Sequence, residues 1–183
     1  MALPHYSQDQ TSKKGMQYEP VQANLFEVTI LPPAGVADSP LLIQHVNSIS
    51  GLDLYKAIEA KTQKFKFATR SYAGMPDGTA HDVTVNFSLN LNDANQAYLY
   101  KTIKDWYTLQ YNSATGEMGL KKDYVGTIII TQFNRVGDIY RTLTYEECFL
   151  TSAVGLGDND YAAPDAKTLE IVWRSDVAKE ELA

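Results

Sequence analysis

Residues 81–112, HDVTVNFSLNLNDANQAYLYKTIKDWYTLQYN, change their hydrophobic period once, and this change decides the fold class. Between 81 and 90 apolar and polar side chains alternate, which is the pattern of a strand with one face in a core. The apolar face carries Val83, Val85, Phe87 and Leu89. The polar face, which we expect to point away from the core, carries Asp82, Thr84, Asn86, Ser88 and Asn90.

The same stretch then adopts helical spacing. Asn92 or Asp93 can cap a helix N-terminus, because a short polar side chain accepts hydrogen bonds from the first free backbone amides. Good helix formers follow, and apolar side chains recur on one side. We therefore predict one helix over about residues 93–111 that packs on a sheet through its core face. That core face consists of Leu99, Ile103, Trp106 and Tyr107.

Strand patterns lie on both sides of this helix along the chain. Phe26, Val28 and Ile30 alternate with other side chains until two prolines end the pattern. The remaining strand candidates are residues 41–49, 124–133, 139–145 with an extended continuation, and 167–173. The order of strands, one helix and strands again predicts a mainly β fold. We expect an antiparallel β-sandwich or barrel with one flanking α-helix.

The 183 residues favour one domain. We place it at 24–174, after a polar N-terminal arm over 1–23 and before a charged C-terminal tail over 175–183. The net charge of −6 argues against a protein that grips DNA, which usually needs a basic face. No apolar run is long enough for a membrane-spanning segment, and no signal peptide is recognisable, so we expect a soluble protein made in the cytoplasm.

Patterns for catalysis or ligand binding are missing from the sequence. His5, His45 and His81 lack metal-ligand spacing, and the single Cys148 excludes an internal disulfide. The glycines at 155 and 157 do not precede a helix that would bind phosphate. Asp158, Asp160 and Asp165 do not fit a calcium loop. We therefore predict no enzyme, no metal and no cofactor.

Residues 52–72, which we call the ribbon, are both basic and apolar. LDLYKAI (52–58) and KFKFATRSY (64–72) alternate like strands, and EAKTQ (59–63) between them suggests a hairpin tip. One interpretation is a solvated strand face that blunts a sheet edge. The other is a hairpin that protrudes and pairs with a neighbouring copy, since an uncovered two-stranded hairpin is marginal in water.

Six segments, taken in order, resemble a known family: ANLFEVTI, SISGLDLYKAIEAK, HDVTVNFSLN, NDANQAYLYKTIKDWY, CFLTSAVGL and KTLEIVW. Together they are similar to the inner tube proteins of contractile injection machines. That family includes contractile bacteriophage tail tubes, tubes of extracellular contractile injection systems and, more distantly, type VI secretion tubes. The resemblance covers residues 24–174.

The resemblance implies homohexameric rings that stack into a tube, with inner strands joined in one β-barrel around a lumen. It implies that the ribbon is an extended inter-subunit β-hairpin, whose candidate residues are Leu52, Leu54, Lys56, Lys61, Lys64, Phe65, Lys66, Phe67 and Arg70. The polar face of residues 82–90 would line the lumen, because a water-filled barrel is polar inside. The ribbon lysines would meet acidic groups of the next ring, such as Asp158 and Asp160 or Glu180 and Glu181.

The implied partners are copies of the chain itself, a sheath protein, baseplate or tail-initiator proteins and a tape-measure protein. DNA, or effector protein, would pass without sequence-specific binding. The expected location is a virion tail made from protein in the host cytoplasm. The alternative is a cytoplasmic or released injection particle of an extracellular or type VI-like system, and a lower-ranked alternative is a monomeric ligand-binding β-barrel. An enzyme on a β-sandwich ranks lowest, since no acid and base converge.

Overall fold

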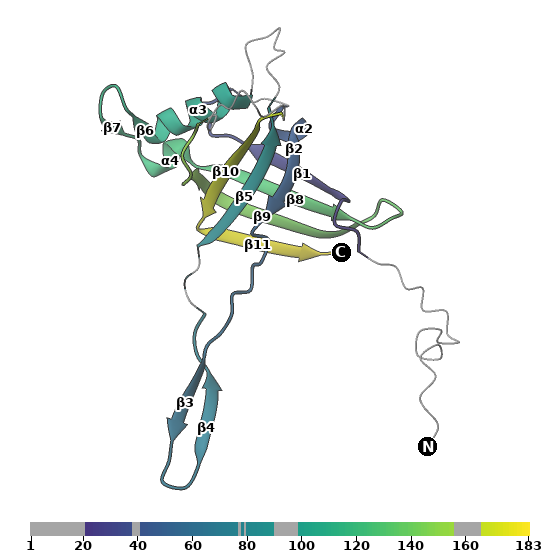
Figure 1. The fold of residues 1–183 in the computed structure, drawn as a ribbon, viewed down its shortest axis with the longest axis vertical. Coiled ribbons are helices and arrows are strands. Elements are labelled where there is room, and N and C mark those ends of the chain that lie inside the picture. The colour runs from purple at the N-terminus through teal and green to yellow at the C-terminus, as the bar shows by residue number, and fades with distance from the viewer. Residues whose placement is uncertain (1–20, 38–40, 77, 79, 90–98, 156–165) are drawn as a thin grey trace.

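A computed structural model describes residues 21–37, 41–76, 78, 80–89, 99–155 and 166–183. Within this part of the chain the fold class is confirmed: the structure is mainly antiparallel β, with one longer helix beside the sheets (Figure 1). The strands are β1 Phe26–Leu31, β2 Val46–Ser50, β3 Ala60–Lys64, β4 Thr69–Ala73, β5 His81–Ser88, β6 Tyr111–Asn112, β7 Glu117–Met118, β8 Gly126–Phe133, β9 Ile139–Leu150, β10 Thr168–Ser175 and β11 Val177–Leu182. The helices are α2 Leu41–Gln44, α3 Leu99–Gln110 and α4 Lys121–Tyr124. None of these helices is long and apolar enough to cross a membrane.

The main sheet bends into two layers that share β9. Its strand order is β1-β8-β9-β10-β5-β2, with β11 added to β9. The first part of β9 pairs with β8 and β11, and its end pairs with β10 through Phe149 and Leu150. Between the two parts Glu147 has a positive φ of 54° and the β8–β9 register shifts. A bulge bends a strand, so β9 turns the corner there and β2, β5 and β10 cross over the other strands (Figure 1).

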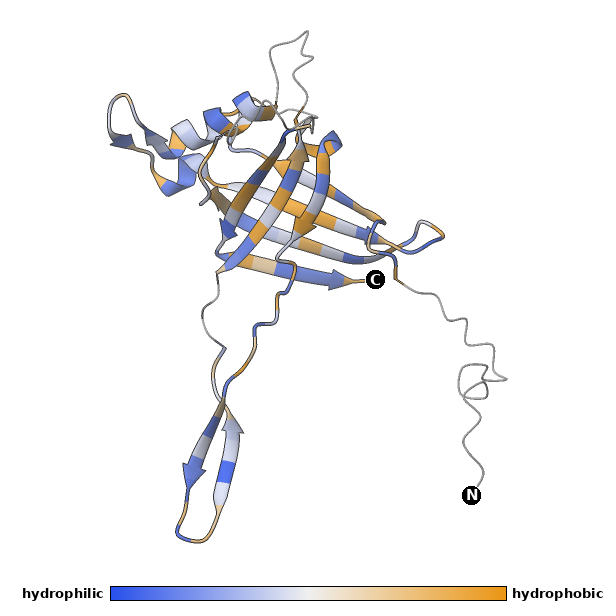
Figure 2. Cartoon of the chain, viewed as in Figure 1, coloured by the Kyte–Doolittle hydropathy of each residue, from blue (hydrophilic) through white to orange (hydrophobic). Residues whose placement is uncertain are grey.

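The core lies between the layers and follows the period of two. In β5 the buried apolar residues are Val83, Val85 and Phe87, and in β10 they are Leu169, Ile171 and Trp173. The same alternation in β1 buries Val28 and Ile30. The alternation predicted for these three strands is therefore confirmed, and Figure 2 shows it as alternating hydrophilic and hydrophobic bands. Each buried aliphatic or aromatic side chain contributes roughly 1.5–3 kcal/mol.

Helix α3 packs on this core through Leu99, Ile103, Trp106 and the additional residue Thr102. The indole N–H of Trp106 donates to the Tyr124 carbonyl at 2.7 Å, and its ring lies 6.0 Å from that of Trp173. Tyr107 is 36% exposed, so its placement on the core face is wrong. Tyr107 follows Trp106 by about 100° of helix rotation and therefore falls at the edge of the apolar stripe.

The predicted helix boundaries are only partly described. The helix ends at Gln110, one residue before the expected end, while residues 90–98 with the predicted start lie outside the described part. Residues 41–49 differ from the prediction of one strand, because α2 precedes β2 there. A short apolar run such as LLIQ does not distinguish helix from strand by its period. The described residues therefore contain two short helices besides the predicted one, α2 and α4, each of four residues.

The C-terminal segment also differs from its prediction as a charged tail. Residues Val177–Leu182 form β11, which pairs with β9 from Glu146 to Arg141. Two cross-strand ion pairs accompany the ladder: Lys179 with Glu146, and Arg141 Nε with Glu180 at 2.5 Å. Charges that look like a solvated tail in the sequence are therefore cross-strand partners at a sheet edge.

Candidate assembly surfaces

The ribbon is a two-stranded hairpin that projects far from the body (Figure 1). β3 and β4 pair from Ala60–Ala73 to Lys64–Thr69, and every residue of both strands is exposed. The turn is closed where the Phe65 amide donates to the Ala68 carbonyl at 2.6 Å. The predicted tip at 59–63 is therefore wrong: those residues belong mostly to β3, and the tip is 65–68. Residues 52–58, expected as a strand, are not one in the structure.

Two large aromatic side chains at the hairpin tip, residues 65–68, are exposed to solvent. Phe65 is 52% exposed and Phe67 is 91% exposed. The Lys66 ammonium lies over the Phe67 ring, 5.3 Å from its centroid, in a cation–π contact. Lys61, Lys64 and Arg70 are exposed on the same hairpin. A two-stranded hairpin with an uncovered aromatic end is marginal alone, so this surface is suited to a partner.

The root of the ribbon is attached to the body. Leu52 and Leu54 pack partly buried against the core, so these two residues are not part of the exposed apolar load. The chain leaves the body through residues 52–59, the outgoing arm, and comes back after β4 through the returning arm, which includes Met75, Pro76 and Ala80. Lys56 of the outgoing arm donates a hydrogen bond to the Ala80 carbonyl of the returning arm. The Glu180 carboxylate of β11 raises the pKa of the nearby Tyr55 hydroxyl on the outgoing arm. These contacts set the direction in which the ribbon leaves.

A glycine begins this root. Gly51 has φ +83°, and a Cβ added to it would lie 2.1 Å from the Asp82 carbonyl oxygen of β5. The Tyr145 hydroxyl donates to the Gly51 carbonyl at 3.5 Å, and burial raises the pKa of Tyr145 to about 12. The close approach of β2 to β5 and the turn into the ribbon therefore need a residue without a side chain.

The polar residues predicted on β5 lie on its outer face. Asp82 accepts two hydrogen bonds from Arg174, both at 2.8 Å, and this pairing holds the pKa of Asp82 below its usual value. Asn86 donates to the Ser48 hydroxyl of β2 at 3.3 Å. Thr84 and Ser88 complete the row between β2 and β10. Asn90 lies outside the described residues.

This polar layer has one open edge among the described strands. β2 ends the strand order and pairs only with β5. At the other side, the chain after β9 pairs with β10, where the Thr151 amide donates to the Val172 carbonyl at 2.9 Å. The Leu150 amide and carbonyl at the end of β9 are hydrogen-bonded to the side-chain amide of Gln110 of α3, at 2.7 and 3.2 Å. Backbone groups at an open edge are free to pair with another chain.

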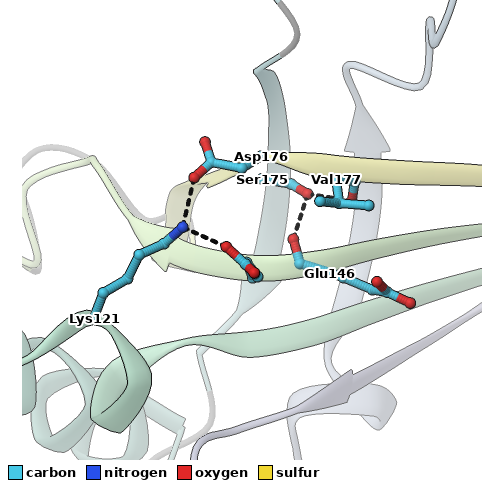
Figure 3. A network of polar contacts seen from close by, with 6 residues as sticks. Lys121, Glu146, Ser175, Asp176 and Val177 are labelled. Atoms are coloured by element: carbon cyan, nitrogen blue, oxygen red, sulfur yellow. Dashed lines mark hydrogen bonds and ion pairs between the residues drawn. The ribbon is translucent and has the colours of Figure 1, made fainter.

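A polar network that the sequence did not reveal fixes the corner of β9 (Figure 3). Lys121 of α4 contacts Asp176 at 2.7 Å and also Glu147, and these hydrogen bonds raise the pKa of Lys121. The buried Ser175 hydroxyl lies 2.6 Å from the Glu146 carbonyl and 2.7 Å from the Val177 carbonyl. Lys121 is 26 and 55 positions from its partners, so no local spacing indicates the network.

The described residues contain no group of three or more His, Cys, Asp and Glu side chains that would hold a metal ion. Cys148 is buried, and burial raises its pKa to about 11, which leaves the thiol protonated and unreactive at neutral pH. His81 contacts the Tyr145 ring edge-on at a centroid distance of 6.3 Å.

No protein-family model and no curated protein matches this chain. Solved structures do. A chain in the cryo-EM structure of an extracellular contractile injection system, the PVC sheath–tube complex in the extended state, has 20% identity and a TM-score of 0.59, with 94% of this chain and 98% of that chain covered. A chain in the PVC sheath/tube terminator in the extended state has 17% identity and a TM-score of 0.60, with 91% and 99% covered.

A chain in the cryo-EM structure of the anti-feeding prophage cap, a tube terminating cap, has 17% identity and a TM-score of 0.57, with 91% of this chain and 93% of that chain covered. Similarities at this level of identity show the fold. This chain therefore has the fold of chains found in the sheath–tube and tube-terminator assemblies of contractile injection systems.

Proposed function

We propose that this chain is a structural subunit of the inner tube of a contractile injection machine and assembles into stacked hexameric rings. The observation that carries the proposal is the ribbon, an exposed hairpin with an aromatic tip that its own chain leaves uncovered. Another copy of the chain would supply the missing contact.

The open β2 edge of the polar layer supports ring formation, in which the Gln110 side chain would release the Leu150 backbone to the β2 edge of the next copy. β2, β5, β10 and the end of β9 are successively antiparallel, so β2 and the end of β9 run in opposite directions. Rotation about an axis that roughly follows the strands preserves their directions. The β2 edge of one copy would then meet the β9 end of the next copy as an antiparallel pair. Such head-to-tail contacts generate a closed ring when the rotation closes.

The polar face of β5 would then line the lumen. Its exposed groups are short and neutral apart from the Asp82–Arg174 pair, and a water-filled barrel interior is polar in this way. The net charge of −6 would help a polyanion slide past without sticking. Around the tube we propose a sheath protein, with baseplate or tail-initiator proteins at one end and a tape-measure protein inside.

Two cargoes are compatible with this role. A contractile bacteriophage tail would carry DNA, and an extracellular contractile injection system would carry effector protein. The similar chains come from PVC and anti-feeding prophage assemblies, and at 17–20% identity they support the fold of the tube subunit for either cargo. The less favoured monomeric carrier would need an apolar cavity, yet Phe87, Trp106 and Trp173 fill the space between the layers.

The proposal is tested by concentrating the purified chain and imaging it with negative-stain electron microscopy. We expect rings or hollow tubes. Hydrogen exchange provides the second readout: amides of residues 60–73 exchange rapidly in the monomer and slowly in the assembly. A chain that stays monomeric at every concentration, with ribbon amides already protected, would refute the tube and favour the carrier.

A further inference from the structure

An open groove of about 420 Å³ lies at the root of the ribbon. Its apolar lining comes from the outgoing arm, the returning arm and β11: Leu54, Tyr55, Ile58, Pro76, Val177 and Ala178. Tyr55 is 83% exposed and Ile58 is 55% exposed, so the groove walls are only partly covered by their own chain. A concave apolar surface of this kind suits one or two large side chains.

The tip of the ribbon has the complementary chemistry. Phe67 is 91% exposed at the end of a narrow hairpin, and Phe65 is 52% exposed two residues earlier. Aromatic side chains on a slender projection are effective anchors, because they bury a large area when they enter a pocket.

Charge identifies the partner as a second copy of this chain. Residues 56–73 hold five basic side chains and one acidic side chain, a net charge of +4. Since the whole chain carries −6, the remaining residues carry −10. In the groove itself Asp176 is paired with Lys121 and Lys56 adds a positive charge, so the attraction comes from the acidic body as a whole. A basic ribbon is therefore attracted to the acidic body of another copy.

We propose that the ribbon tip of one copy docks in the root groove of a second copy, with Phe67 as the anchor and Lys64 and Lys66 facing the net-acidic body around it. This inference rests on the proposed tube, and it names the surface that receives the ribbon. It has a geometric consequence. The ribbon spans 14 residue steps from Leu52 to Lys66, so at about 3.3 Å per residue it reaches at most about 45 Å. The ribbon roots of the two docked copies are then separated by at most about that distance.

Disulfide trapping tests the inference. One chain carries Ala68→Cys, which leaves both phenylalanines of the tip in place, and a second chain carries Val177→Cys in the groove. The native Cys148 is buried and stays silent. As matched control, Val177→Cys is replaced by Val136→Cys, an exposed valine in the β8–β9 turn outside the groove. The mixed chains are assembled, oxidised and digested, and cross-linked peptides are identified by mass spectrometry.

We expect the 68–177 cross-link in assembled material and no 68–136 cross-link. Assemblies that form normally but give no 68–177 peptide, or equal amounts of both peptides, would overturn the groove and leave the tube standing. A wild-type chain that never assembles in the same microscopy would overturn the tube and the groove together.

An independent measurement uses the critical concentration for assembly. Phe67→Ala should raise it at least about tenfold, as expected for loss of a buried aromatic anchor. Met75→Ala is the control, because Met75 is 90% exposed on the ribbon arm but does not line the groove. Equal effects of the two substitutions would overturn the role of Phe67.

Discussion

The substitution Gly51→Ala tests how β2 leads into the ribbon. Gly51 combines two constraints: a positive φ of 83° and a position where a Cβ would lie 2.1 Å from the backbone oxygen of Asp82. Neither constraint can be relieved by a flexible side chain, because the obstructing atom belongs to the β5 backbone. The substitution therefore has to displace β2 from β5 or to rotate the start of the ribbon.

The expected loss of stability is the sum of two terms. The left-handed conformation costs an alanine about 1–2 kcal/mol. Forcing a methyl group into occupied space costs about 1–3 kcal/mol. We therefore expect Gly51→Ala to lower the free energy of unfolding by about 2–5 kcal/mol, a large part of the roughly 5–15 kcal/mol typical of a domain.

Urea unfolding of the monomer measures this loss, and Gly137→Ala is the matched control. Gly137 also has a positive φ, of 99°, but a Cβ there would meet nothing within 4 Å. The control should cost only the conformational term of about 1–2 kcal/mol. Equal losses for the two variants would refute the reasoning, because they would mean that β2 and β5 have room for a side chain at residue 51.

Three further predictions concern charge and reactivity. Reversal of Lys64 and Lys66 to glutamate should leave the monomer folded, since both side chains are exposed, but should impair stacking; normal tubes would make them a merely solvated face. Because Arg174 lowers the pKa of Asp82 in the folded state, that pair stabilises the fold at neutral pH and loses its effect as the pH falls below about 4. The partly exposed pair is worth at most about 1 kcal/mol, so the gap in urea midpoint between wild type and Asp82→Asn should be small at neutral pH. It should shrink as the pH falls through the lowered pKa of Asp82, and a gap that widens in acid would contradict this sign. Finally, native Cys148, with its pKa raised to about 11, should react with maleimide only at the rate of unfolding, whereas rapid labelling of the folded chain would show that it is not buried.

The sequence predicted best the elements that have one face in the core. In β1, β5 and β10 the buried side chains fall on alternate positions, so the sequence itself shows the period of two. The ribbon lacks this constraint. All residues of β3 and β4 are exposed, and the polar run 59–63 looked more like a turn than the true tip at 65–68.

The remaining differences arise from contacts between distant residues. β11 has no apolar face, and it is held by its ladder to β9 and by cross-strand charges. The hydrogen bond of Lys121 to Asp176 depends on the bend in β9 at Glu147. No local sequence pattern predicts this bend. For the candidate site, the ribbon and the polar row of β5 were recognised from sequence, whereas the root groove needed the path of three separate segments.

The most direct test of the tube is a cryo-EM reconstruction of the assembled chain. We predict a hollow tube whose lumen is lined by the face of β5 that carries Asp82, Thr84, Asn86 and Ser88, with the β2 edge of each copy paired to the β9 end of the next. An assembly without a lumen, or one with this face turned outward, would contradict the account.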